Sequence, residues 1–143
     1  MDRLSFTVPG EPRGKQQGHP GIVNGHAMIF QSKQTRIYQN IVGMAAQAAL
    51  AGRTPFDVPI RLDVVVRITP AASASKRRRA AMLAGEIRPG KKPDLSNFIK
   101  AVEDGCNKIA FRDDALVVSI RAEKRYSEVA GMDVALTAVG AGL

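Results

Sequence analysis

The sequence predicts a single α+β domain. Its 143 residues fit the usual size of one domain and are enough to bury one hydrophobic core. Some segments alternate apolar and polar residues, as half-buried strands do, whereas others repeat apolar residues at helical spacing. No internal repeat, low-complexity tract or change of composition divides the chain, so we expect one compact domain over residues 1–143.

The first strand is expected close to the N-terminus. Leu4, Phe6 and Val8 alternate with polar residues until Pro9 and Gly10, which predict a turn. Residues 9–25 are rich in Gly, Pro, Gln and Lys, and this composition predicts a long, polar and basic loop. A second short strand is expected over residues 27–30.

A helix is expected over residues 35–52, with Thr35 as its N-cap and Gly52 at its end. Its apolar positions, among them Ile37, Ile41 and Val42, follow helical spacing. After a turn, residues 60–68 alternate apolar and charged side chains, which is typical of a strand with one solvated face. This is the clearest strand in the sequence.

Two further helices are expected on either side of a basic loop. Ser73 or Ser75 can cap a short helix over residues 76–83, and the basic loop then runs to Pro93. Residues 95–109 have the pattern of a strongly amphipathic helix, whose apolar face belongs in the core. Its opposite face is available for chemistry and carries Asn97, Lys100, Asp104 and Asn107.

Two strands are expected in the last part of the chain. Residues 116–123 are rich in Val and Ile, and residues 132–139 have a similar pattern. Because only a short loop around residues 127–131 separates them, we expect these two strands to pair as an antiparallel hairpin.

The charge of the chain favours a polyanionic partner. Lys and Arg number 21 and Asp and Glu number 13, which gives a net charge of +8. An excess of this size on one small domain favours nucleic acid, although many basic proteins bind acidic surfaces only loosely. Aromatic residues make up 5% of the chain and Trp is absent, which argues against a module that stacks several bases.

Cysteine usage and hydropathy indicate an intracellular, cytoplasmic protein. Cys106 is the single cysteine, so the chain has neither an internal disulfide nor a thiolate zinc cluster, and on the apolar helix face it is expected to be a core residue. The N-terminus lacks a signal-peptide pattern, and no apolar stretch approaches the roughly 20 residues that span a bilayer. We therefore expect no membrane partner. A host and a phage origin both stay open.

Acidic residues stand at two places where chemistry is plausible. Asp94 comes immediately before the amphipathic helix, and Lys100 lies about one and a half turns inside it. Asp113 and Asp114 stand at the entrance of the following strand, and the short connection can bring them near Asp94. Carboxylates that hold Mg²⁺ beside a lysine are suited to hydrolysing a phosphodiester, because both neutralise charge on the phosphate.

A structural explanation of the same residues stays open at this point. Asp is common at helix N-caps and in turns, so Asp94 could serve only as a cap, and Asp113 and Asp114 only as turn residues. Residue types by themselves favour this explanation.

In sequence order, three linked motifs resemble the RusA family of Holliday junction resolvases. They are KPDLSN at residues 92–97 followed by Lys100, then Asp104 in the helix, and then FRDDALV at residues 111–117. The family pattern is Asp-x-Asp-Asn-x-x-Lys, an amphipathic helix, and Asp-Asp before a Val-rich strand. The similarity is strong over residues 91–124, and it is weaker in the N-terminal strand, the basic loop and the first helix.

The resemblance implies a homodimer with a small mixed sheet and helices packed on it, which binds four-way DNA junctions and makes paired, Mg²⁺-dependent nicks. No organic cofactor is implied. Asp94 and Asp114 match metal-binding acids and Lys100 matches the essential lysine, so these three are the expected catalytic residues. Asp113 and Asp104 match acids that recur in the family and are further candidate metal ligands.

Ser96 departs from the family pattern, because it stands where the second Asp of Asp-x-Asp is expected. A hydroxyl can ligate Mg²⁺ directly or through water, but more weakly than a carboxylate. We therefore keep Ser96 as a candidate ligand, with the hypothesis that Asp113 or Asp104 makes up part of the missing charge.

Basic residues on several predicted elements are candidates for DNA-backbone contacts. The run over residues 76–79 is often no more than a solvated helix face, yet it lies on the same basic flank as the residues just before Asp94. His19 and His26 lack a third ligand nearby, so we expect no structural metal in that loop. The DNA-contact candidates are Lys15, Lys33, Arg36, Lys76, Arg77, Arg78, Arg79, Arg88, Lys91 and Lys92.

Two other functions remain open. The first is a junction-binding protein on the same fold, in which Ser96 has removed the cutting activity. The second is a general basic protein that binds RNA or DNA and whose acidic residues are incidental; it would show no preference for a four-way junction over duplex DNA.

Overall fold

The computed structural model describes residues 1–140 and has a four-stranded sheet at its centre. The strand order is β1–β6–β4–β5, with β1 at Arg3–Pro9, β4 at Ile60–Ile68, β5 at Val117–Tyr126 and β6 at Gly131–Ala138. The β4–β5 pair is parallel, whereas the β4–β6 and β1–β6 pairs are antiparallel. The sheet is therefore mixed, and the predicted α+β fold class is confirmed.

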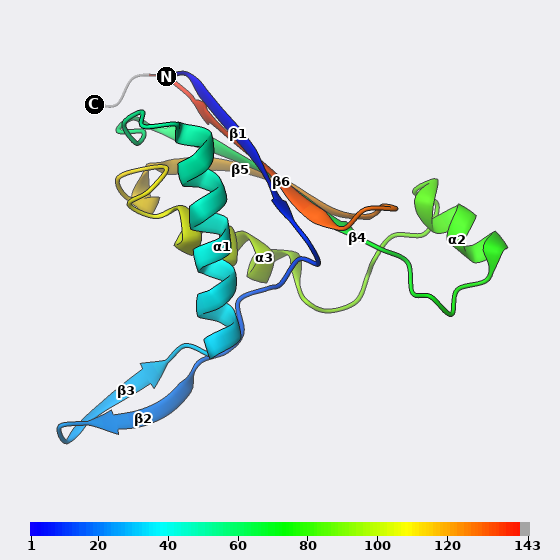
Figure 1. The fold of residues 1–143 in the computed structure, drawn as a ribbon, viewed down its shortest axis with the longest axis horizontal. Coiled ribbons are helices and arrows are strands. Elements are labelled where there is room, and N and C mark those ends of the chain that lie inside the picture. The colour runs from blue at the N-terminus through cyan, green and yellow to red at the C-terminus, as the bar shows by residue number, and fades with distance from the viewer. Residues whose placement is uncertain (141–143) are drawn as a thin grey trace.

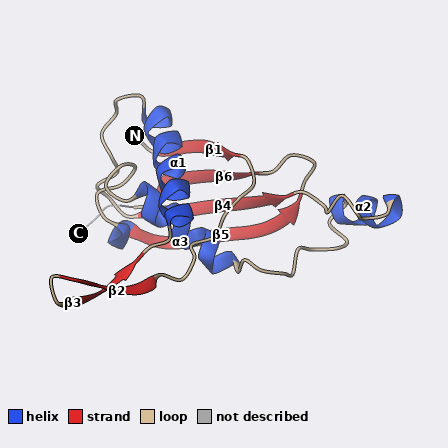
Figure 2. Ribbon diagram, turned by 60° about the horizontal axis from the view of Figure 1, so that its bottom comes forward, coloured by secondary structure: helices blue, strands red, loops and turns tan. Residues whose placement is uncertain are grey.

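Two helices cover the same face of this sheet. They are α1 (Lys33–Leu50) and α3 (Leu95–Cys106), which pack against each other over the strands (Figures 1 and 2). Strand β4 alternates as expected, so that Leu62, Val64 and Val66 are buried beneath the helices. Val42 of α1 and Phe98 of α3 belong to the same buried cluster as these strand residues and complete the core. Within residues 1–140, no helix covers the opposite face of the sheet (Figure 2).

Two smaller elements project from opposite ends of this body (Figure 1). One is the short helix α2 (Lys76–Leu83), capped by Ser75 as predicted, in which only Met82 is buried. The other is a two-stranded hairpin formed by β2 (His19–Val23) and β3 (His26–Phe30). None of the helices within residues 1–140 combines the length and the apolar character needed to cross a membrane.

The prediction of an unbroken loop over residues 9–25 is wrong, because β2 lies within it. The missed signal is Asn24 followed by Gly25, both with positive φ (50° and 76°), the conformation of a tight hairpin turn. The assignment of Thr35 as a helix cap is also wrong. Ser32 caps α1 by accepting a 3.1 Å hydrogen bond from Thr35 N, while Thr35 itself is buried and its Oγ1 accepts a bond from Gln16 N.

The predicted C-terminal hairpin is wrong as well. Strand β6 does not pair with β5; it lies between β1 and β4, and β5 pairs in parallel with β4 at the edge of the sheet. Residues 69–116, which include α2 and α3, provide the long crossover that a parallel pair requires. This topology places α3 and the start of β5 on the same side of the molecule.

Candidate active site

Asp94 occupies the N-cap position of α3, yet its side chain does not act as a cap. Its backbone is extended (φ −63°, ψ 146°), and its carbonyl accepts the first helical bonds from Asn97 N and Phe98 N. The carboxylate makes no capping hydrogen bond and is exposed to solvent. The position is thus that of a cap, as the structural explanation expects, but the carboxylate is left available for a ligand.

The segment that presents Asp94 is held from two sides. From β5, Lys124 Nζ donates to the carbonyls of Lys91 (2.9 Å) and Pro93 (3.1 Å). From the N-terminal loop, Lys15 N donates to the carbonyl of Asn97 (3.0 Å). The loop comes so close that a Cβ at Gly14 would lie 3.0 Å from Pro93 Cβ. These contacts fix the start of α3 relative to the sheet.

One stripe of α3 carries Ser96, Lys100 and Glu103, which follow each other by four and then three residues. Ser96 and Lys100 are exposed, and Glu103 is half-buried. Burial raises the pKa of the Glu103 carboxyl above its usual range, and the negative charges of Asp114 and Asp104 raise it further. Asp114 and Glu103 therefore lie close enough for their negative charges to interact.

A single turn of 3-10 helix, η1 (Asp114–Leu116), begins at Asp114, and Asp113 immediately precedes it. The Asp113 carboxylate accepts a 2.8 Å hydrogen bond from Ala115 N and so caps this turn. This backbone bond, together with a side-chain bond with Asp114 and the charge of Lys108, holds the pKa of Asp113 below its usual range. Asp113 therefore serves at least a structural role, while Asp114 is exposed.

Asp104 points away from this stripe, towards the N-terminal loop and α1. Its Oδ2 accepts hydrogen bonds from Lys15 Nζ (2.8 Å) and Gln39 Nε2 (3.2 Å). Asp104 thus links three segments of the fold, and Lys15 is engaged in an ion pair rather than lying open to solvent.

These side chains can be compared with the needs of a metal ion. Within residues 1–140, no three carboxylate, imidazole or thiolate groups are gathered closely enough to enclose one. Mg²⁺ does not require such a cage, because it usually keeps several waters and binds one or two carboxylates together with substrate phosphates. Asp94 and Asp114 both have exposed carboxylates, which is what an open site of this kind uses, and Glu103 lies near Asp114. Their oxygen donors also suit a hard cation.

The basic candidates are spread around the molecule. Lys33 and Arg36 are exposed at the start of α1, and Lys91 and Lys92 are exposed next to Asp94. Arg88 is exposed and lies 4.0 Å from Glu123 in a loose ion pair. The run on α2 occupies the projecting end of the molecule, with exposed Lys76, Arg77 and Arg78 and half-buried Arg79.

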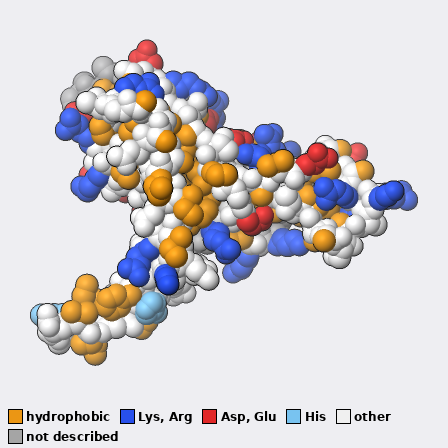
Figure 3. Space-filling view, viewed as in Figure 1, with side chains coloured by type: hydrophobic (Ala, Val, Ile, Leu, Met, Phe, Trp, Pro, Cys, Tyr) orange, Lys and Arg blue, Asp and Glu red, His pale blue; other side chains and the backbone are white. Residues whose placement is uncertain are grey.

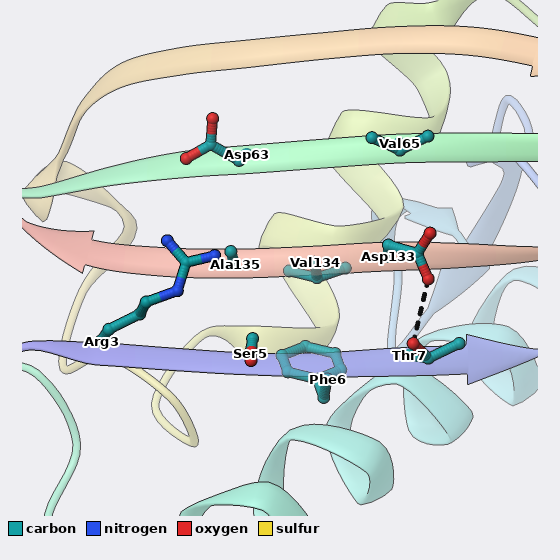
Figure 4. Close-up of a pocket in the computed structure, with 9 residues that line it drawn as sticks. All are labelled: Arg3, Ser5, Phe6, Thr7, Asp63, Val65, Asp133, Val134 and Ala135. Carbon is teal, nitrogen blue, oxygen red and sulfur yellow. Dashed lines mark hydrogen bonds between the residues drawn. The ribbon is translucent and has the colours of Figure 1, made fainter.

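The helix-free face of the sheet has a shallow hollow of about 480 Å³, lined by residues of β1, β4 and β6 (Figure 4). Its carboxylates are neutralised by neighbours. Asp133 accepts hydrogen bonds from Thr7 (3.0 Å) and Arg67 (3.0 Å), and Asp63 accepts one from Arg61 (3.0 Å). This hollow therefore lacks the uncommitted acids that the region around Asp94 provides.

The sequence did not lead us to select Glu103 or Lys124 as candidate residues of this site. Glu103 could have been found, because it lies three residues after Lys100 and so shares its helix face. Lys124 could not, because its contacts join residues 31 and 33 positions apart through the fold.

Two comparisons with known proteins bear on this site. A sequence model of the family described as endodeoxyribonuclease RusA matches residues 9–137, which is most of the chain. The chain is also similar to the uncharacterized protein YqaN of Bacillus subtilis (strain 168). The two are 32% identical over 143 residues, covering 99% of this chain and 100% of the relative.

Proposed function

Since the chain belongs to the RusA family of endodeoxyribonucleases, we propose that it is a Mg²⁺-dependent enzyme that resolves four-way (Holliday) DNA junctions by paired phosphodiester hydrolysis. The observation that carries this proposal is the carboxylate of Asp94. It stands at the start of α3, exposed and without a capping bond, on a segment that Lys124 holds in place.

Asp94 and Asp114 would hold the metal ion, which when bound neutralises phosphate charge and makes a water more acidic. Lys100 belongs to the stripe of α3 that also carries Ser96 and Glu103, and its ammonium group would stabilise the charge that develops on the phosphate oxygens. Ser96 would contribute its hydroxyl, directly or through water. The surrounding basic residues would attract the DNA backbone.

Glu103 is the residue that we propose compensates for Ser96. The earlier hypothesis named Asp113 or Asp104, but Asp113 caps η1 and Asp104 pairs with Lys15. Glu103 shares the helix stripe with Ser96 and lies near Asp114, and its pKa is raised first by burial and then by the charge of Asp114. A cation placed between them would relieve this repulsion.

We further propose that the enzyme acts as a homodimer, because two symmetric cuts require two active sites related by a two-fold axis. The backbone contacts would come from the basic run on α2, together with Lys33, Arg36, Arg88, Lys91 and Lys92. Lys15 is a weaker candidate, since Asp104 already neutralises it. The biological setting would be recombination, repair or the processing of phage DNA.

The experiment that tests the substrate compares a synthetic four-way junction with a duplex of equal length. Binding is measured in EDTA, and cleavage is then measured after Mg²⁺ is added. Tighter binding to the junction and Mg²⁺-dependent nicks at symmetric positions would support the proposal. Equal affinity for both DNAs without cleavage would contradict it and favour a general basic nucleic-acid-binding protein. A junction preference without cleavage would identify a binding protein that Ser96 has deprived of nuclease activity.

A further inference from the structure

The β2–β3 hairpin leaves large apolar side chains uncovered. All five residues of β3 are exposed, and the hairpin extends away from the sheet and helices. Ile22 and Ile29 are 77% and 72% exposed, more than any other large apolar residue described. Figure 3 shows the hydrophobic side chains gathered on this arm.

The hairpin is apolar on both of its faces. In the strand register Pro20 lies opposite Ile29, and Ile22 lies opposite Ala27, so one face carries four apolar residues. Met28 and Phe30 occupy the other face. An isolated two-stranded hairpin is marginally stable in water, and one that also exposes this much apolar surface needs a covering partner.

The charge pattern of this region favours a protein partner over DNA. Between Lys15 and Arg53, the only Asp, Glu, Lys or Arg side chains are those of Lys33 and Arg36. The rest of the chain is dense in charge and carries the net excess of basic residues. Depletion of charge and enrichment in Met and aromatic residues are typical of the centre of protein–protein interfaces, whereas DNA-backbone surfaces are rich in Lys and Arg.

A second apolar surface lies on α1, which begins three residues after the hairpin ends. Ile37, Ile41 and Met44 follow each other by four and three residues and are 48%, 39% and 69% exposed. Although their helical spacing would suit a core position, the core-facing side chains of α1 are instead those of Tyr38, Val42, Ala46 and Leu50. Ile37, Ile41 and Met44 therefore form an outer stripe on α1, beside the stripe that faces the core.

The uncovered apolar surface provides most of the area that a standard dimer interface buries. Eight residues contribute to it: Ile22, Val23, Met28, Ile29, Phe30, Ile37, Ile41 and Met44. Their exposed fractions amount to on the order of 600 Å², if a fully exposed large side chain presents roughly 150 Å². A standard interface buries about 800 Å² per partner, which these residues and their uncharged polar neighbours would supply.

We propose that this surface is covered by a second copy of the chain, with the hairpin of each protomer packed on the outer stripe of α1 of its partner. Two identical chains of net charge +8 repel each other, and this repulsion is weakest where the surface carries few charges. One chain supplies both the arm and the surface that receives it, which satisfies the self-complementarity of a two-fold interface. This inference rests on the homodimer proposed above and names its interface.

The test measures the oligomeric state by light scattering after size exclusion, without DNA or metal, so that its outcome does not depend on nuclease activity. The native protein should have twice the mass of one chain. The Ile22→Asp/Ile29→Asp variant should be a monomer with an unchanged circular dichroism spectrum, because both side chains are already exposed. Val129→Asp is the matched control, since Val129 is 66% exposed on the β5–β6 loop and should leave the dimer intact.

A native monomer would overturn the dimer and its interface, while junction cleavage could still be found. A dimer that persists in the double aspartate variant would overturn this interface alone. If the native protein is a monomer and the variant loses affinity for DNA, the hairpin is a DNA contact and the inference is wrong.

A crosslinking experiment tests the arrangement itself. The single native cysteine, Cys106, is fully buried, and burial, followed by the charge of Glu103, raises its pKa to about 12, so it should not react. Mixing Ile29→Cys protein with Ile41→Cys protein and adding a short bismaleimide should join the two chains. Mixing Ile29→Cys with Val129→Cys should not, and equal yields from both mixtures would contradict the arrangement.

Discussion

At the scale of single residues, the site combines groups that the sequence could identify with groups that it could not. Asp94, Lys100 and Asp114 were identified from local motifs whose spacing has a chemical meaning, and their catalytic roles stay predictions. Two interactions were not predictable from the sequence. Asp104 forms an ion pair with Lys15, and Asp113 accepts a hydrogen bond from the backbone of η1. Ser96 was recognisable as a departure from the family pattern, and the spacing of Glu103 from Lys100 could have identified Glu103 as a residue of the same helix face.

The compensating role of Glu103 gives a residue-scale prediction. Glu103→Gln should raise the Mg²⁺ concentration that gives half-maximal cleavage by roughly tenfold, because a neutral amide is a weaker ligand than a carboxylate. Junction affinity in EDTA should not fall. The measurement is a Mg²⁺ titration of cleavage rate, with the exposed Glu128→Gln as the matched control. An unchanged Mg²⁺ requirement in Glu103→Gln would remove this residue from the site.

At the scale of secondary-structure elements, most helices and strands were predictable, whereas their pairing was not. The alternation in β4 and the helical spacing in α3 are local and were correctly interpreted. Strand β6 is mostly buried in its place between β1 and β4, and this burial outweighs the short connection that favours pairing with β5. Because β5 then pairs with β4, Lys124 comes to lie against the segment before α3.

Lys124 is therefore a positioning residue for Asp94, and its replacement should separate cleavage from binding. Lys124→Met frees the carbonyls of Lys91 and Pro93, and a displacement of about 1 Å at the active site can cost on the order of 100-fold in rate. Single-turnover cleavage should fall by that order, while junction affinity in EDTA changes little. Lys124→Arg, which can still donate to both carbonyls, should recover part of the rate. Equal rates in the native and Met proteins would refute this role.

The short helix α2 should act through its charge. Basic side chains at its N-terminus oppose the helix dipole, so helix stability does not explain them. Replacing Lys76, Arg77, Arg78 and Arg79 with Gln should weaken junction binding and reduce the slope of log affinity against log salt by roughly one to three. The slope is obtained from dissociation constants across a salt series. As a control, Arg3→Gln on the helix-free face of the sheet should leave the slope unchanged. A slope that the α2 variant does not alter would show that α2 does not contact DNA.

At the scale of the whole molecule, charge is separated along the chain. The basic helix α2 projects from one end, the uncharged hairpin projects from the other, and the segment carrying Asp94 lies between them (Figures 1 and 3). The net charge was evident from composition, but this separation was not, because it depends on the direction in which each element leaves the sheet. The arrangement suits a protein that pairs with itself at one surface and meets DNA at others.

The most direct test of the central claim is cleavage of a labelled four-way junction by the native protein, Asp94→Asn and Ser96→Asp, each with Mg²⁺ or EDTA. The native protein should cut only with Mg²⁺, Asp94→Asn should bind the junction without cutting it, and Ser96→Asp should cut at lower Mg²⁺ concentration. Asp2→Asn, which changes an exposed acid at the start of the chain, should behave as the native protein. Cutting that persists in Asp94→Asn or in EDTA would contradict the account.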